Sequence, residues 1–107
     1  MKKIITFILT FFLFTLSPNA IENITINNYD LVPRYDKDNK VYNVFTSINT
    51  EIITINVVHS EGETITGNGS KSLKKGINKF EINSYLNNQI SKTYTIFVTR
   101  GQEVDLK

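Results

Sequence analysis

The residues best suited to chemistry stand together in one short stretch of the chain. A base, a hydroxyl nucleophile and an acid follow one another as His59, Ser60 and Glu61. These are the residue types of a hydrolase triad. Adjacent residues of an extended chain point to opposite sides, so His59 is poorly placed to activate Ser60. The sequence also lacks a G-x-S-x-G motif. We therefore predict a protein that is not an enzyme, with no catalytic residues and with His59 in an exposed loop.

The acidic residues suggest a second chemistry, which is metal binding. Asp36, Asp38 and Asn39 resemble the start of a calcium loop, but Ser47 stands where an EF-hand needs its twelfth-position Glu. The chain has no Cys and a single His, so a zinc site would need several carboxylates around His59. We predict a solvated turn here, with no metal and no cofactor; a weak calcium site is the alternative.

Exposed aromatic rings suggest a third chemistry, because ring faces can stack on sugars or on a protein partner. Phe45 and Phe97 alternate with apolar residues on the opposite face of their predicted strands, and Tyr29, Tyr35 and Tyr85 lie in connecting segments. A second apolar face can be a binding surface. The alternative interpretation is that these rings seal the edges of the fold.

The segments that carry these residues are predicted to be strands. Residues 21–107 contain 12 Ile, 7 Val and 9 Thr but no Ala, and 12 Asn that favour turns. Apolar and polar residues alternate in six segments: 24–26, 41–46, 51–58, 63–67, 79–83 and 94–100. Turn residues separate them, including residues 67–70 and a hairpin at 87–89. We predict an all-β fold of six to seven short antiparallel strands in a two-sheet sandwich, with a small barrel as the competing architecture.

One of these segments is expected to lie in the middle of a sheet. Residues 52–58 combine high β-propensity with no charge and no Pro, which makes them an aggregation hazard if they are exposed. We therefore predict a central, paired strand.

The amino-terminal residues predict export. Lys2 and Lys3 precede an apolar run at 4–16, and Ala20 is a suitable residue before a cleavage site. As a helix the run would span about 20 Å, which is short for a bilayer core of about 30 Å. We predict a signal-peptide helix within 1–20, a domain at 21–101 and a short tail at 102–107, with a secreted or cell-surface location. An uncleaved segment acting as a membrane anchor is the alternative.

The charge balance restricts the predicted partners. Twelve Lys and Arg against ten Asp and Glu give a net charge of +2, but Lys2 and Lys3 belong to the predicted signal, so the rest of the chain is neutral. A neutral domain lacks the basic surface that nucleic acid binding requires. We predict cell-wall glycan or another surface protein as the partner, no nucleic acid, and membrane contact only if the signal stays uncleaved.

Four motifs in order resemble the bacterial cadherin-like β-sandwich domains. They are L-x-P-x-Y followed by Y-x-V, a central strand with two Ile, G-x-N-x-F-x-I, and a closing Y-x-I-x-V-x-R strand. The residues that carry them are Leu31, Pro33, Tyr35, Tyr42, Val44, Ile53, Ile55, Gly76, Asn78, Phe80, Ile82, Tyr94, Ile96, Val98 and Arg100. The resemblance implies an immunoglobulin-like sandwich of an exported surface protein. It implies a non-catalytic module for adhesion, for glycan or wall binding, or for spacing; a membrane-tethered accessory protein is the alternative.

Several of these residues also have a physical role that the sequence predicts. Pro33 cannot donate to a strand ladder, so it suits an edge or the entry point of a strand. Tyr42 and Tyr94 can bury a ring and still bond through their hydroxyls. Gly76 is expected to have a positive φ, and Arg100 is expected to pair with a carboxylate or with carbonyls.

Overall fold

The computed structural model describes residues 21–101, so the predicted signal peptide and the tail at 102–107 lie outside the described residues. This part of the chain forms seven strands and no helix. The strands are β2 (Ile21–Ile26), β3 (Val41–Thr46), β4 (Ile52–His59), β5 (Glu63–Thr66), β6 (Gly69–Ser72), β7 (Gly76–Leu86) and β8 (Gln89–Arg100). None of the described residues belongs to a helix long and apolar enough to cross a membrane.

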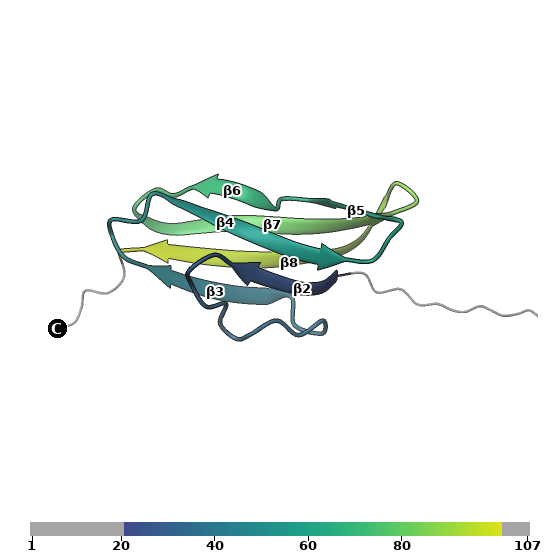
Figure 1. Ribbon diagram of the computed structural model, residues 1–107, viewed down its shortest axis with the longest axis horizontal. Coiled ribbons are helices and arrows are strands. Elements are labelled where there is room, and N and C mark those ends of the chain that lie inside the picture. Colours follow the sequence, from purple (N-terminus) through teal and green to yellow (C-terminus); the bar gives the residue numbers. More distant parts are fainter. Residues whose placement is uncertain (1–20, 102–107) are drawn as a thin grey trace, which may run out of the picture.

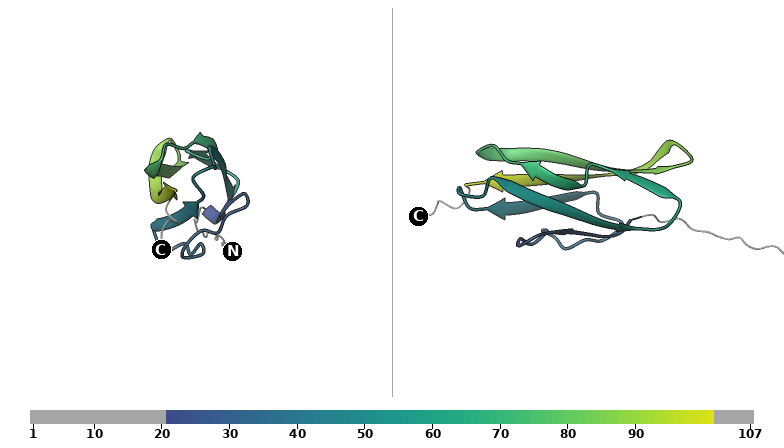
Figure 2. Two further views of the ribbon diagram at one scale, coloured as in Figure 1. Left: turned by 90° about the vertical axis from the view of Figure 1, so that its left-hand side faces the viewer. Right: turned by 45° about the horizontal axis from the view of Figure 1, so that its top comes forward.

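The strands form two sheets that enclose a common core. One sheet has the order β2-β4-β6 and the other the order β3-β8-β7-β5 (Figure 1). Seen along the long axis, the strands surround the core as two layers (Figure 2). The predicted all-β class with two sheets is therefore confirmed for the described residues. Strand β4 pairs with both β2 and β6, so the prediction of a central strand at 52–58 is also confirmed.

Four predictions about the strands were wrong. Tyr85, expected in a connecting segment, lies within β7, and His59, expected in an exposed loop, is the last residue of β4. The sheets are not purely antiparallel, because β3 runs parallel to β8 from Val41↔Thr95 to Thr46↔Arg100. Alternation shows which face a residue takes but not the direction of its partner, which depends on how the connection from β2 crosses between the sheets. Residues 69–72, predicted as part of a turn, form β6 and give β4 its second partner.

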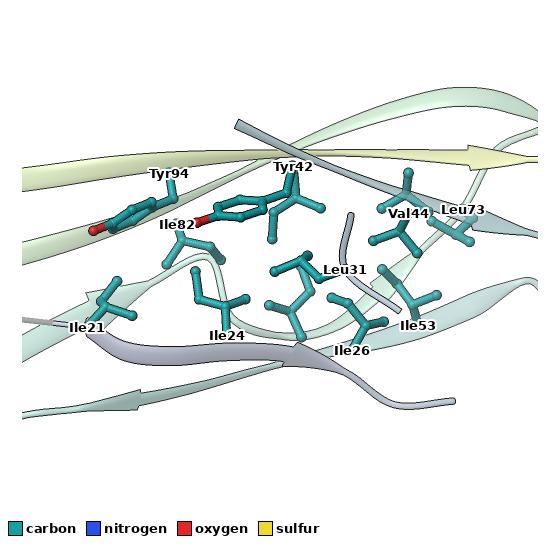
Figure 3. Packing of buried hydrophobic residues seen from close by; sticks show 13 residues of the cluster. Ile21, Ile24, Ile26, Leu31, Tyr42, Val44, Ile53, Leu73, Ile82 and Tyr94 are labelled. Atoms are coloured by element: carbon teal, nitrogen blue, oxygen red, sulfur yellow. The ribbon is translucent and has the colours of Figure 1, made fainter. Parts of the chain in front are cut away.

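The core consists of the inward positions of both sheets together with residues from two connecting segments (Figure 3). Six core residues have no exposed surface: Tyr42, Val44, Ile82, Tyr94, Ile96 and Val98. The remaining buried hydrophobic residues are Ile21, Ile24, Ile26, Leu31, Ile53, Ile55 and Leu73, and Phe80 packs against the cluster while only partly buried. Burial of this apolar surface supplies the main driving force for folding.

Two turns depend on residues that tolerate positive φ. Asn87 and Asn88 have φ angles of 56° and 68° and join β7 to β8, as expected for a two-residue hairpin. Gly67 has a φ of 94°, and a Cβ added there would clash with the Glu81 carbonyl oxygen. Glycine is therefore required where the chain crosses from β5 to β6.

A covering segment protects the edge strand β3, and an inward-facing charge protects the edge strand β6. The backbone N–H of Val32 donates to the Asn43 carbonyl (2.8 Å), and the N–H of Asn43 donates back to Val32 (2.7 Å), which occupies the middle of edge strand β3. Pro33 follows this bridge and its peptide bond is cis. On edge strand β6, Lys71 pairs with buried Ile53 and therefore faces inward. Inward charges and covering segments both discourage pairing with other chains.

Candidate functional site

Three tyrosine rings pack together under the segment that connects β2 to β3. Tyr42 and Tyr94 lie on the inner face of β3 and β8 and are fully buried. The ring of Tyr35 stacks on Tyr42 with centroids 6.0 Å apart and meets Tyr94 edge to face at 5.7 Å. Such pairs are the favoured geometries of aromatic quadrupoles.

The hydroxyls of these rings hold the connecting segment in place. Tyr42 donates to the Asp36 carbonyl (2.7 Å) and accepts the Asp36 N–H (2.9 Å). Tyr94 donates to the Lys37 carbonyl (3.1 Å) and Tyr35 donates to the Ile21 carbonyl (2.7 Å). The expectation that Tyr42 and Tyr94 bury their rings and bond through their hydroxyls is confirmed.

Burial shifts the pKa of two of these phenols. It raises the pKa of Tyr35 well above its ordinary value, and the hydrogen-bonded hydroxyl of Tyr94 adds to the shift. Burial also raises the pKa of Tyr42, partly offset by the hydrogen bond from the Asp36 backbone. Both shifts favour the neutral phenols, whose hydroxyls anchor the connecting segment.

A groove lies beside this support, between β2 and the segment that follows it. Its volume is about 350 Å³, at the lower end of the usual range for small-molecule sites. The groove is lined by Asn23, Ile24, Thr25, Ile26, Tyr29, Asp30, Leu31, Arg34 and Tyr35. A second hollow of about 490 Å³ adjoins it through Tyr35 and is lined by Ile21, Glu22, Asp36 and Lys37 as well.

The groove has an apolar floor and a polar rim. Ile24, Ile26 and Leu31 are buried, whereas Asp30 and Arg34 are exposed. Neither Asp30 nor Arg34 forms an ion pair or hydrogen bond with another residue of the described range, so both remain available to a ligand. A few convergent polar groups over an apolar surface are typical of a binding site.

The two tyrosines of the groove are held in different ways. The Tyr29 hydroxyl hydrogen-bonds to the Thr50 hydroxyl, and its backbone N–H donates to the Ile26 carbonyl (3.3 Å). Tyr35, which the sequence suggested as an exposed ring, is half-buried with its hydroxyl bonded to Ile21. Both rings are therefore fixed walls and not mobile side chains.

A second candidate surface is the outer face of β3, β8 and β7. Phe45 is 52% exposed and Ile77 71% exposed, and both pair with Thr99 on β8. Phe97 lies on the same face but is only half-buried. Its exposed rings and aliphatic side chains offer an apolar contact surface.

The other sequence candidates form local structure. The Nδ1–H of His59 donates to the Ser60 backbone carbonyl (2.9 Å), whereas the Ser60 hydroxyl donates to a Glu22 carboxylate oxygen at 3.5 Å and not to the His59 ring. The Asp36 carboxylate accepts the Asp38 N–H (2.9 Å) and closes the predicted turn. No cluster of three or more potential metal ligands occurs within residues 21–101.

The remaining motif residues join the loops at one end of the domain. The amide of Asn78 bonds both the N–H (3.0 Å) and the carbonyl (2.8 Å) of Lys74. Arg100 donates to the carbonyls of Ile48 and Leu73, both at 2.8 Å. Of the two expected partners, a carboxylate or carbonyls, the structure shows carbonyls. Gly76 has the expected positive φ, at 89°.

Sequence reasoning missed most of the polar groove. Asn23 and Thr25 come from β2, whereas Asp30 and Arg34 come from the following segment. No sequence spacing predicts that these two regions meet, because the groove forms between β2 and the segment that follows it. The aromatic residues Tyr29 and Tyr35 were the available signal.

Comparisons with known proteins add no assignment. No protein-family model matches the chain, and neither a curated protein nor a solved structure matches it. The functional argument therefore rests on the site itself.

Proposed function

We propose that the protein is a non-catalytic, exported module of the cadherin-like β-sandwich type, and that it binds cell-wall glycan in the groove beside β2. The groove is the single observation that carries this proposal. It combines the rings of Tyr29 and Tyr35 with the exposed polar groups of Asp30 and Arg34, which have no ion-pair partner within residues 21–101.

The chemistry of the groove suits a sugar. Ring faces contact the apolar face of a pyranose, whereas carboxylate and guanidinium groups accept from and donate to its hydroxyls. The neutral charge of residues 21–107 gives no general attraction to polyanions, so binding depends on these local contacts. The parallel pair of β3 and β8 and the two-layer architecture are compatible with an immunoglobulin-like sandwich.

Binding to isolated wall material and to soluble wall oligosaccharides tests the proposal. Arg34→Ala should weaken binding by about tenfold or more, because a hydrogen bond to a charged group contributes about 1.5–3 kcal/mol. Lys75→Ala is the matched control, since Lys75 is also an exposed cation but does not line the groove. Equal binding by the Arg34→Ala variant and the wild type would contradict the proposal. Loss of binding on Phe45→Ser, with Arg34 unimportant, would move the site to the outer face.

The location of the protein requires a separate measurement. Cell fractionation followed by intact-mass determination should find a chain that begins at Ile21 in the medium or wall fraction. A full-length mass in the membrane fraction would instead support the membrane-tethered accessory protein, which acts through a partner complex.

A further inference from the structure

One strand has a long unpaired edge. Strand β7 pairs with β8 along its whole length, from Gly76 to Leu86, but with β5 only from Asn83 onward. Within the described residues, the stretch 76–82 therefore has no partner strand on its second side.

The hydrogen-bonding pattern shows which backbone groups face this edge. The N–H of Thr95 donates to the Lys40 carbonyl (2.7 Å), and the N–H of Gly101 donates to the Thr46 carbonyl (3.1 Å). The backbone N–H and C=O groups of odd-numbered residues in β8 therefore face β3. The backbone groups of even-numbered residues in β8 then face β7, and the β7 residues opposite them are also even-numbered. The odd-numbered residues Ile77, Lys79 and Glu81 consequently direct their N–H and C=O groups out of the sheet. The Glu81 carbonyl is approached by Gly67, and the other groups stay open.

The side chains along this edge alternate in character. Lys79 and Glu81 face outward and form an exposed ion pair at 3.6 Å. Phe80 faces the core but is only half-buried, with the Lys71 ammonium 6.0 Å from its ring. An added strand would fit best with an acid beside Lys79, a base beside Glu81 and apolar residues toward Phe80.

Residues 103–107 have this pattern, with the sequence Glu-Val-Asp-Leu-Lys. In a parallel register, Asp105 lies beside Lys79 and Lys107 beside Glu81. Leu106 then lies beside Phe80 and Val104 beside Asn78 on the core side, because side chains alternate along a strand. The antiparallel register would instead bring Glu103 next to Glu81, where like charges repel. We propose that residues 103–107 of a second copy add to the open edge of β7.

The chain's own tail cannot occupy this position in the same register. The hydrogen bond from Gly101 to Thr46 directs the chain toward β3, away from the open edge. That edge lies two strand spacings from β8, about 10 Å, whereas the two residues from Gly101 to Glu103 span at most about 7 Å. A second copy has no such limit.

The geometry favours a closed, reciprocal dimer. Gly76, where β7 begins, pairs with Arg100, where β8 ends, so the tail leaves from the end of the domain that carries the open edge. Two copies that meet at this end can each donate a tail to the other about a two-fold axis. Each tail then runs in the direction of β7, which is the register that the charges favour.

Sedimentation equilibrium of residues 21–107 tests the proposal, since this chain keeps every described strand and core residue. We expect a concentration-dependent monomer–dimer equilibrium within roughly 10 µM to 1 mM. Lys79→Glu should weaken dimerisation by about three- to tenfold, because an attractive cross-strand pair becomes repulsive. Combining it with Asp105→Lys should restore dimerisation. Lys37→Glu, the same charge change at an exposed position away from this edge, should leave dimerisation unchanged.

Two results would overturn the proposal. One is a chain that stays monomeric up to 1 mM. The other is a dimer that Lys79→Glu leaves unaffected, or that the double variant fails to restore while circular dichroism shows both variants folded.

Discussion

Tyr42→Phe removes one hydroxyl and leaves the buried ring in place. This hydroxyl forms two hydrogen bonds with the backbone of Asp36, at 2.7 and 2.9 Å. A typical intramolecular hydrogen bond contributes about 1 kcal/mol net, and more if a buried group is left unpaired. Because Asp36 is exposed, water can reach its freed N–H and C=O groups. We therefore expect the free energy of unfolding to fall by about 1–2 kcal/mol.

Urea denaturation at pH 7, followed by circular dichroism, measures this loss from the shift in midpoint at constant slope. Tyr85→Phe is the matched control, because the Tyr85 hydroxyl makes no hydrogen bond with another described residue; its effect should stay within about 0.5 kcal/mol. The reasoning is refuted if Tyr42→Phe costs less than about 0.5 kcal/mol or if both variants lose the same stability. Weaker glycan binding should accompany the loss, since the segment that Tyr42 holds continues into the groove wall.

The remaining predictions concern other buried groups. Ser84 is fully buried and its hydroxyl has no described hydrogen-bond partner, so Ser84→Ala should raise the unfolding free energy by up to about 1 kcal/mol in urea denaturation; a loss above 1 kcal/mol would contradict this. Gly67→Ala should cost at least about 2 kcal/mol more than Gly62→Ala by the same assay, because both have positive φ but only Gly67 abuts a backbone carbonyl; equal costs would show that the chain can shift there. Burial raises the pKa of Tyr42, so its contribution to stability is complete below about pH 10 and decreases above it, at most by about 1.4 kcal/mol per pH unit. Urea midpoints between pH 9 and 11 should therefore fall less steeply for Tyr42→Phe than for the wild type, and parallel profiles would refute this.

Much of the fold follows from alternation along the sequence. Tyr94, Ile96 and Val98 share one face of β8 and all are fully buried, because a period of two places every second side chain on the core face. The direction of β3 could not be predicted in this way, since a parallel and an antiparallel strand show the same alternation. Strand β6 was missed for a different reason. Its sequence, Gly69–Ser72, contains no apolar residue, and it is a strand because it pairs with β4.

The candidate site was predictable only in its aromatic part. Tyr29 and Tyr35 stand out because large rings in connecting segments are either packed or used for binding, and here they are packed walls of a groove. Asp30 and Arg34 are ordinary loop residues in the sequence. Their meeting with β2 depends on where the chain leaves that strand, which is a tertiary property that no local pattern contains.

Chemical-shift mapping by NMR with soluble wall oligosaccharides tests the central claim most directly. The account predicts that backbone amide shifts will concentrate at Asn23, Thr25, Tyr29, Asp30 and Arg34, and that the outer-face amides of Phe45 and Phe97 will stay unchanged. Shifts confined to the outer face, or no shifts at millimolar oligosaccharide, would contradict the assignment of the groove as the binding site.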